Sequence, residues 1–318
     1  MTFLSKKNYF LFLLMTAFVF ISTTAMALNK DSDAQDLKPL ANFQAVKSVK
    51  HFPQNPILGA NTTFPLISAQ GVIAVDLDSG VPLYEKNPDS QLLPASTTKI
   101  VTALVAIETY KPDEILTVPY GVAVDGQKMG LYSGEQMRFK DLLYGLLVYS
   151  ANDAAMTLAM NYPMASESGT ASYEAFVLAM NEKAQELHMD NSYFENPVGL
   201  DGASQMTTAR DLLHVSEVAM KNPEFAEVVG TKEITVTDVS GSSKYRLKNI
   251  NELLEDTPGV LGIKTGWTEN ARENLVTYIE RDGHKVIIAV LGSQDRFGET
   301  QELIDWIFSN YEWQEVKK

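Results

Sequence analysis

The pattern of hydrophobic and polar positions changes period along the chain, and each period predicts a kind of element. Residues 70–77 and 81–85 are short, largely apolar stretches on either side of an Asp78-Ser79-Gly80 turn, which predicts two strands in an antiparallel hairpin. Residues 94–106 begin with a proline and continue apolar on every side, which predicts a helix buried within a domain. Apolar positions three or four apart predict further helices over residues 141–149, 153–161, 173–187 and 208–221.

The last third of the chain has the pattern of strands, which alternates most clearly over residues 233–237. The predicted strands cover residues 233–237, 260–267, 273–281 and 284–291, the last two forming a hairpin across Asp282-Gly283. An amphipathic helix follows over residues 299–309. Strands at both ends and helices in the middle predict the α/β (α+β) class: one antiparallel sheet flanked by helices, with an inserted, mostly α-helical lobe.

The first 61 residues lack the pattern of a folded domain. Two lysines precede an apolar run, and Ala25-Met26-Ala27 offers a small-residue cleavage site, so residues 1–27 predict a secretory signal peptide, cleaved or retained. Residues 28–61 are polar and turn-rich, which predicts a flexible leader. The folded domain is therefore expected over residues 62–318 of a protein exported to the periplasm or cell envelope.

Composition narrows the classes of function. The chain has 318 residues, of which 45% are hydrophobic, and it has no cysteine, which excludes disulfides, thiolate metal sites and cysteine nucleophiles. An exported protein without cysteine fits a bacterial envelope. A net charge of −14 argues against nucleic acid and against adhesion to anionic lipid. The four histidines show no metal-binding spacing, so neither a metal nor another cofactor is expected.

The predicted buried helix carries reactive side chains in its first turn. Ser96 and Lys99 are three residues apart, so their side chains lie on one helix face. A neutral amine beside a hydroxyl can take its proton and make the serine a nucleophile without a histidine. Burial and the positive end of the helix dipole both favour the neutral amine. A Ser-x-x-Lys match alone is common by chance, so it needs support from elsewhere in the chain.

Two later stretches supply that support. Ser150-Ala151-Asn152 falls at a break between two predicted helices, where Ser150 could also be a simple helix cap. Lys264-Thr265-Gly266 falls in a predicted strand. In order after Ser96 and Lys99, these stretches complete the three-part pattern of penicillin-binding proteins and class A β-lactamases, and each part occurs once.

Several longer stretches resemble the D-alanyl-D-alanine carboxypeptidase family of low-molecular-weight penicillin-binding proteins, the serine D,D-peptidases of the S11 type. They are Leu93-Pro94-Ala95-Ser96-Thr97-Thr98-Lys99, Asp141-Leu142-Leu143-Tyr144-Gly145-Leu146-Leu147, Asn152-Asp153-Ala154-Ala155, Asn196-Pro197-Val198-Gly199-Leu200-Asp201, Thr208-Ala209-Arg210-Asp211-Leu212 and Gly262-Ile263-Lys264-Thr265-Gly266. The resemblance spans residues 69–308, and it implies the β-lactamase/transpeptidase-like fold.

The resemblance also implies a reaction. A serine-type carboxypeptidase of this family removes the terminal D-alanine from peptidoglycan stem peptides that end in D-Ala-D-Ala. Ser96 would attack the peptide carbonyl with Lys99 as its base, and water would release the acyl-enzyme. Ser150 would relay a proton toward the leaving amine, and Asn152 would hold the substrate amide. β-Lactam antibiotics would acylate the same serine as covalent inhibitors.

The third motif is expected to border the cleft between sheet and lobe. Lys264 in the same pocket would favour the neutral form of Lys99, because like charges oppose each other's protonation. A strand containing Thr265 and Gly266 can pair by its backbone with an extended substrate, and glycine keeps that approach uncrowded.

Two kinds of anchor complete the expected site. The family's oxyanion hole consists of two backbone N–H groups, which map to Ser96 and Trp267. The terminal carboxylate of the substrate needs a cationic or hydroxyl partner, for which Thr265 and Arg296 are candidates. Arg296 could instead be a solvated loop charge.

Three other functions stay open. A β-lactamase of the same fold is disfavoured, because no Glu-x-x-Leu-Asn occurs between Asn152 and Lys264. A binding module that is acylated without turnover would normally be fused to a membrane helix or a signalling domain. Endopeptidase action on cross-links is not separated from carboxypeptidase action, since the two bonds are chemically similar.

The chain also departs from the family pattern. Tyr149 and Ala151 stand where the family usually has proline and glycine, and Arg272 stands where a glycine is common. No separate C-terminal β-rich domain is expected. The tail of residues 311–318 is too short for a membrane anchor, so no strong anchor is expected in the mature chain.

Overall fold

The computed structural model describes residues 54–120, 124–163 and 169–315. These residues belong to one compact unit, Phe52–Lys318. The predicted signal peptide and the predicted leader up to residue 53 lie outside the described residues, and they stay predictions.

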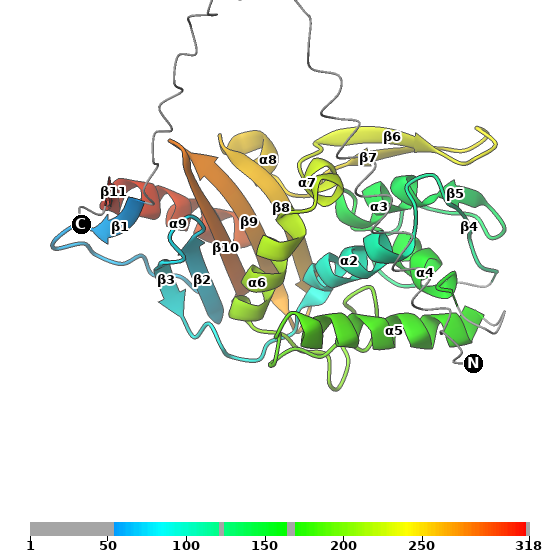
Figure 1. Ribbon diagram of the computed structural model, residues 1–318, viewed down its shortest axis with the longest axis horizontal. Coiled ribbons are helices and arrows are strands. Elements are labelled where there is room, and N and C mark those ends of the chain that lie inside the picture. The colour runs from blue at the N-terminus through cyan, green and yellow to red at the C-terminus, as the bar shows by residue number, and fades with distance from the viewer. Residues whose placement is uncertain (1–53, 121–123, 164–168, 316–318) are drawn as a thin grey trace, which may run out of the picture. The chain divides into compact units, whose positions relative to one another are not determined.

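A five-stranded antiparallel sheet forms the centre of this unit (Figure 1). Its strands, in spatial order, are β3 (Pro82–Lys86), β2 (Gly71–Asp76), β10 (His284–Ser293), β9 (Arg272–Arg281) and β8 (Val260–Thr268). Both predicted hairpins are present, and β10 pairs directly with β2, from Val286 opposite Asp76 to Leu291 opposite Gly71. The two ends of the chain therefore build one sheet, as predicted, and β8 is one of its two edge strands.

Helices cover both faces of the sheet and bury a core on each. One face packs against α9 (Arg296–Asn310), whose Leu303 and Ile307 are fully buried. The other face carries α6 (Ala209–Met220), which packs on β2 and β10, and beside it α2 (Lys99–Thr109), as Figure 1 shows. Every residue in the first two turns of α2 is buried, which explains why its sequence is apolar on all sides.

The chain between β3 and β8 forms the predicted helical lobe. Besides α2 and α6, it contains α3 (Phe139–Leu147), α4 (Asn152–Met160), α5 (Gly169–Glu186), α7 (Pro223–Val229) and α8 (Leu253–Asp256), and two ribbons, β4 (Ile115–Thr117) with β5 (Gln136–Arg138) and β6 (Glu233–Thr237) with β7 (Lys244–Lys248). The pattern did not predict α7 or β7. The predicted strand β6 pairs with β7 and not with the central sheet.

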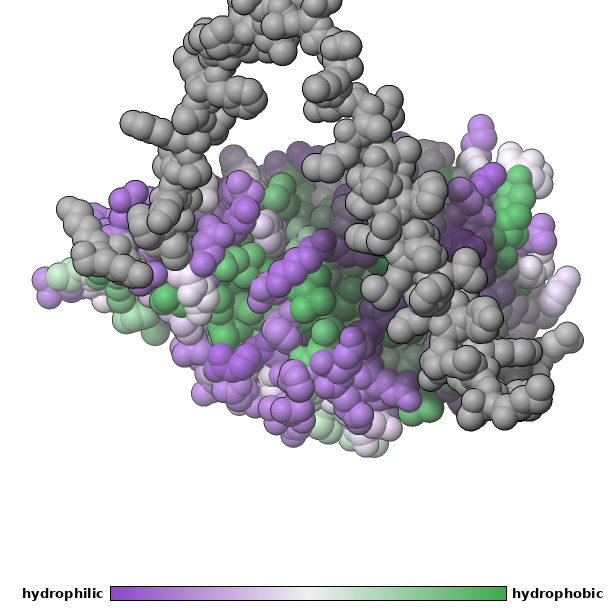
Figure 2. All heavy atoms as spheres, in the orientation of Figure 1, coloured by the Kyte–Doolittle hydropathy of each residue, from purple (hydrophilic) through white to green (hydrophobic). Residues whose placement is uncertain are grey.

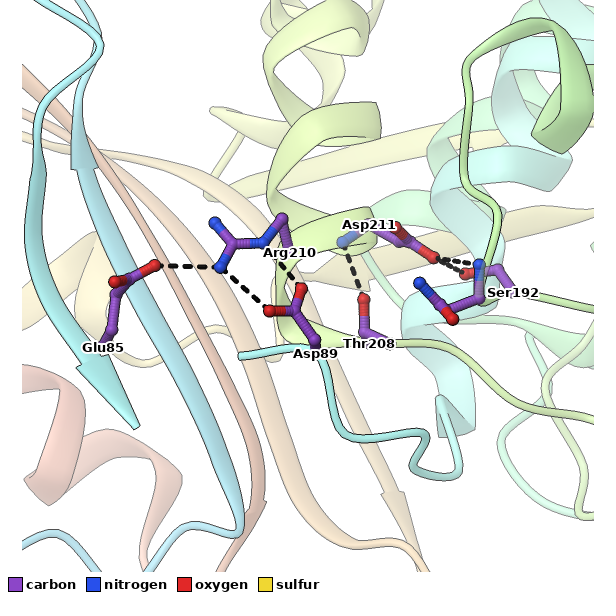
Figure 3. A network of polar contacts seen from close by, with 7 residues as sticks. Glu85, Asp89, Ser192, Thr208, Arg210 and Asp211 are labelled. Atoms are coloured by element: carbon purple, nitrogen blue, oxygen red, sulfur yellow. Dashed lines mark hydrogen bonds and ion pairs between the residues drawn. The ribbon is translucent and has the colours of Figure 1, made fainter. Parts of the chain in front are cut away.

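Helix α6 is fastened on two sides at its N-terminal end (Figure 3). The Nε of Arg210 donates to Asp89 Oδ1 at 2.6 Å, and its Nη2 donates to Glu85 Oε1 at 3.0 Å. The next residue, Asp211, turns the other way and accepts a hydrogen bond from Ser192 Oγ at 2.7 Å. One helix end thus links the β3 side of the sheet to a loop of the lobe.

Strands from the two extremes of the described chain pair with each other. β1 (Gln54–Leu58) runs antiparallel to β11 (Tyr311–Glu315), with Gln54 opposite Glu315. The prediction of a flexible leader up to residue 61 was therefore wrong for residues 54–58. Residues 311–315, for which no element was predicted, form the partner strand. Neither segment alternates regularly enough to be predicted as a strand from its own sequence. Each is a strand because it pairs with the segment at the other end of the described chain.

The visible surface of the described residues is largely hydrophilic (Figure 2), with hydrophobic residues showing as smaller areas between hydrophilic ones. Large apolar side chains that stand exposed include Leu66, Tyr120 and Trp267. No helix within the described ranges is both long enough and apolar enough to cross a bilayer.

Candidate active site

Ser96 lies in a short 3₁₀ turn, η1 (Ala95–Thr98), that leads directly into α2. The helix expected from residue 94 therefore begins with a tighter turn. Ala95 has a left-handed backbone, with a φ of 47°, which is strained for a residue other than glycine. Asn274 of β9 donates to the two carbonyls that precede Ala95, both at 2.9 Å. The sheet thus holds the nucleophile's turn in place, and Ser96 stays partly exposed.

Lys99, the first residue of α2, is fully buried, and its amine has three oxygen neighbours. Its Nζ lies 2.8 Å from Ser96 Oγ, 2.7 Å from Asn152 Oδ1 and 2.6 Å from the carbonyl oxygen of Val198. Burial lowers the pKa of Lys99 to about 7, because the charged amine loses its hydration. An amine that is neutral near pH 7 can accept the proton of the neighbouring hydroxyl.

The carbonyl of Val198 belongs to a loop that Asn196 shapes. The Oδ1 of Asn196 accepts the backbone N–H groups of Val198, Gly199 and Leu200. Gly199 has a φ of 87°, and a Cβ placed on it would lie 1.9 Å from the carbonyl oxygen of Ala95. Only glycine allows the loop to come this close to the nucleophile's turn. Sequence reasoning noted this stretch in the family resemblance but gave it no role.

Ser150 and Lys264 form the second pair of the site. Ser150, with a φ of 60°, stands in the break between α3 and α4, where it accepts a hydrogen bond from Lys264 Nζ at 2.8 Å. It does not cap α4, whose N-cap is the next residue. Burial, with the charges of Lys99 and Arg296 acting in the same direction, lowers the pKa of Lys264 well below its ordinary value. At Lys99 the cause is burial, so its neutral form does not depend on the charge expected from Lys264.

Helix α4 begins with Asn152 and Asp153, which together hold the loop of residues 125–131. Asn152 donates to two carbonyls of this loop, at 2.6 Å from Nδ2 and 2.7 Å from its backbone N. The carboxylate of Asp153 accepts three successive backbone N–H groups, at 3.1, 2.8 and 3.0 Å. The first half of the loop lines the cleft. Because both atoms of its amide are engaged, Asn152 here connects Lys99 to the cleft wall.

A cleft of about 680 Å³ opens beside the nucleophile. The residues of the sequence prediction that line it are Ser96, Ser150, Asn152, Thr265, Gly266, Trp267 and Arg296. A Cβ on Gly266 would lie 3.0 Å from the backbone N of Ser96, so the edge strand passes close to the nucleophile. The Thr265 Oγ1 and the Arg296 Nε are buried and have no hydrogen-bond partner among the described residues. Two such donors fit a carboxylate.

The structure therefore brings all nine predicted residues to one place. Seven line the cleft, and the two lysines lie beneath it, each hydrogen-bonded to one of the serines. Arg296 is the first residue of α9 and donates to the carbonyl of Gly266 at 3.2 Å, so it is not a solvated loop charge. Sequence reasoning missed Val198, Gly199 and Asp153. The only available sign of them was their place in the family resemblance.

The sequence profile of the peptidase S11 family, described as D-alanyl-D-alanine carboxypeptidase, matches residues 59–295. This chain belongs to that family. Among S11 relatives, it is 31% identical over 263 residues to the D-alanyl-D-alanine carboxypeptidase DacF of Bacillus subtilis, covering 80% of this chain and 66% of DacF. It is 31% identical over 250 residues to a D-alanyl-D-alanine endopeptidase of Pseudomonas aeruginosa, covering 76% of this chain and 77% of that protein.

The solved structures of S11 relatives share the fold. The crystal structure of the Streptomyces K15 DD-transpeptidase superposes with a TM-score of 0.73 at 33% sequence identity, covering 78% of this chain and 100% of that chain. The β-lactamase/transpeptidase-like fold expected from the motifs is thereby confirmed. The chain spans just under two thirds of the length of DacF.

Proposed function

We propose that this chain is a penicillin-binding, serine-type D-alanyl-D-alanine carboxypeptidase. The observation that carries the proposal is the 2.8 Å distance between Ser96 Oγ and the buried amine of Lys99, whose pKa is lowered to about 7. Membership of the S11 family supports the substrate class, which is a peptidoglycan stem peptide ending in D-Ala-D-Ala. β-Lactams are expected to acylate the same serine.

The reaction begins with acyl transfer to Ser96. Its Oγ attacks the carbonyl carbon of the penultimate D-alanine while Lys99 Nζ takes the hydroxyl proton. The backbone N–H groups of Ser96 and Trp267 stabilise the oxyanion. The C–N bond then breaks, and Ser150, hydrogen-bonded to Lys264, relays to the leaving nitrogen the proton that Lys99 took, which returns Lys99 to its neutral form. Water hydrolyses the resulting ester and restores the serine hydroxyl.

The substrate is held from both ends of the reacting bond. Thr265 and Arg296 bind the terminal carboxylate, for which their unpartnered donors are suited. The edge of β8 around Gly266 pairs with the extended peptide backbone. Asn152 fixes the position of Lys99 relative to the cleft wall, because its Oδ1 accepts a hydrogen bond from the lysine amine at 2.7 Å while its Nδ2 donates to the wall.

The decisive experiment uses the chain from Leu28 onward, with Ser96→Ala as its control. Release of D-alanine from diacetyl-Lys-D-Ala-D-Ala is followed while a fluorescent penicillin reports acylation. We expect both signals from the native chain and neither from the variant. Labelling without release would contradict carboxypeptidase action, and absence of labelling would contradict a working serine site.

Endopeptidase action is the second candidate, because a relative of similar identity carries that name. Both reactions use the same acyl-enzyme and differ in the size of the leaving group. A cross-linked peptide dimer offered beside the monomeric stem peptide separates them. Faster release of monomer from the dimer than of D-alanine from the stem would assign the endopeptidase.

Export is proposed with the activity, since a stem peptide lies outside the cytoplasmic membrane. The lysine pair, apolar run and small-residue site of residues 1–27 support it. Fractionation of the native host and N-terminal sequencing test it. A mature N-terminus at Leu28 is expected for cleavage, and recovery from the cytosol would contradict export.

A further inference from the structure

A second depression lies beyond Trp267, next to the cleft that holds Ser96. It has a volume of about 390 Å³, and it shares Trp267 and Glu269 with the cleft. The remaining residues that line it are Arg272, Glu273, Ser293 and Gln294. Ionisable side chains of both signs therefore line a space that opens beside the reacting centre.

The proposed carboxylate anchor sets the direction in which a substrate lies along β8. If Thr265 and Arg296 bind the terminal carboxylate, the reacting carbonyl lies at Ser96 and the N–H of Trp267. Residues before the reacting bond must then continue along the edge strand toward Glu269. An extended strand advances about 3.3 Å per residue, so the residue before the D-alanine pair reaches the rim of the second depression.

Trp267 stands between the two spaces with 62% of its surface exposed. An indole left this open at a cleft rim can cover the methylene chain of a bound residue. The turn that follows it is already fixed, because Asp201 accepts hydrogen bonds from Thr268 Oγ1 at 2.8 Å and from Asn270 Nδ2 at 3.0 Å. The turn that carries Glu269 is thus in place before a substrate arrives.

Arg272 occupies a position whose backbone suits glycine. Its φ is 59°, in the left-handed region where a side chain is strained. Its guanidinium makes no hydrogen bond or ion pair with the residues that the structure describes, and neither does the carboxylate of Glu269. Glu273 accepts the backbone N–H of Arg296 through one oxygen, Oε2, at 2.9 Å. The depression therefore offers one guanidinium and two carboxylates that have capacity for a ligand.

We propose that this depression binds a substrate side chain that ends in an ammonium and a carboxylate on the same carbon. The ammonium lies between Glu269 and Glu273, the carboxylate pairs with Arg272, and the methylenes cross Trp267. The inference rests on the proposed function and extends it to substrate choice. Stem peptides with a diamino dicarboxylic acid before the D-alanine pair are preferred over stem peptides with lysine there.

The test compares three peptides that differ in one residue. Each ends in D-Ala-D-Ala, preceded by 2,6-diaminopimelic acid, by lysine or by Nε-acetyl-lysine, and kcat/KM for D-alanine release is measured. The native chain is expected to prefer them in that order, by about fivefold at each step, as partly exposed charge pairs allow. In Arg272→Gly, the diaminopimelate preference over lysine should disappear although backbone strain is relieved. In Glu269→Gln, the lysine preference over acetyl-lysine should fall.

A matched control is Glu280→Gln, since Glu280 is exposed at the opposite end of the same strand, β9, and should keep all three ratios. Equal kcat/KM values for the three peptides would overturn the inference, as would an equal loss with all three in the variants. Protection of Ser96 from a fluorescent penicillin by each peptide gives the same ranking without turnover. If no peptide releases D-alanine, the proposed function fails, while the protection ranking still decides the inference.

Discussion

At the scale of single residues, the site depends on an amine that has been taken out of water. Lys99 is fully buried, and this burial, not a neighbouring charge, lowers its pKa to about 7. A lysine with an ordinary pKa would be protonated throughout the neutral range and could not accept the proton of Ser96. The lowered pKa therefore sets the pH range in which the serine can react.

The first prediction is a pH profile. Below about pH 7, the second-order rate constant for acylation by penicillin should fall roughly tenfold per pH unit, because the fraction of neutral Lys99 falls by that factor. Above this pH the rate constant should level off. Stopped-flow acylation between pH 5 and 9, with circular dichroism to confirm folding, measures it. A rate still rising tenfold per unit at pH 9 would show that the amine keeps its ordinary pKa.

The second prediction concerns Gly199. A Cβ at this position would lie 1.9 Å from the carbonyl oxygen of Ala95, so Gly199→Ala must push the loop away from the nucleophile's turn. Displacement of this kind is expected to slow acylation about 100-fold. The matched control is Gly241→Ala, which has a similar φ of 75° but nothing within 4 Å of the added atom. It should cost about 1 kcal/mol of stability and leave acylation unchanged.

Residue spacing was enough to pair Ser96 with Lys99, because three residues along a helix turn define a distance. It was not enough to find the carbonyl of Val198, which lies 2.6 Å from the same amine but 99 positions along the chain. A backbone oxygen has no side-chain identity that a sequence pattern can register. The role of Lys99 as a base could therefore be predicted from the sequence, whereas its hydrogen-bond partners could be identified only in the folded chain.

At the scale of elements, the first residues of α4 hold the loop that forms part of the cleft wall by hydrogen bonds. The third prediction is that Asp153→Asn loosens the loop of residues 125–131, because an amide cannot accept three backbone N–H groups as strongly as a carboxylate. The loss should be about 2 kcal/mol in urea unfolding, with a raised KM for the stem peptide. The apparent pKa near 7 should stay, since Lys99 keeps its partners. Asp190→Asn, at an exposed position, is the control.

An unchanged KM with lowered stability would show that Asp153 serves folding alone. An unchanged free energy of unfolding would show that its three hydrogen bonds contribute little. The two readouts thus separate a positioning role at the cleft from a purely structural one.

Strands with long apolar runs on both sides of a tight turn were predicted from the sequence, whereas the short strand β7 was not. The hairpins β2–β3 and β9–β10 consist of largely apolar strands joined by glycine-containing tight turns, so each could be predicted alone. β7 does alternate, with Tyr245 and Leu247 buried between exposed residues, but two apolar positions in five residues are a short signal, and its pairing with β6 decides that it is a strand. Pairing of this kind is tertiary information, and local sequence carries little of it.

At the scale of the whole described unit, chain order predicted the architecture. Strands at both ends and helices between them leave few compact arrangements other than a shared sheet with an inserted lobe. What order did not predict was the closeness of the sheet edge to the nucleophile, where Gly266 meets the backbone of Ser96. That contact follows from how β8 packs against η1, which depends on side-chain volume across the interface.

The pairing of β1 with β11 brings the two ends of the described chain side by side. Antiparallel partners lie about 5 Å apart, so Gln54 and Glu315 can be joined by a linker of a few residues. Such a circular permutant, reopened at the exposed Asp282-Gly283 turn, should keep every strand pair and still be labelled by fluorescent penicillin. Loss of labelling would mean that folding requires an intact Asp282-Gly283 turn and that the pairing of β1 with β11 cannot replace it. The first and last residues that the structure describes, Gln54 and Glu315, are therefore direct neighbours across one strand pair.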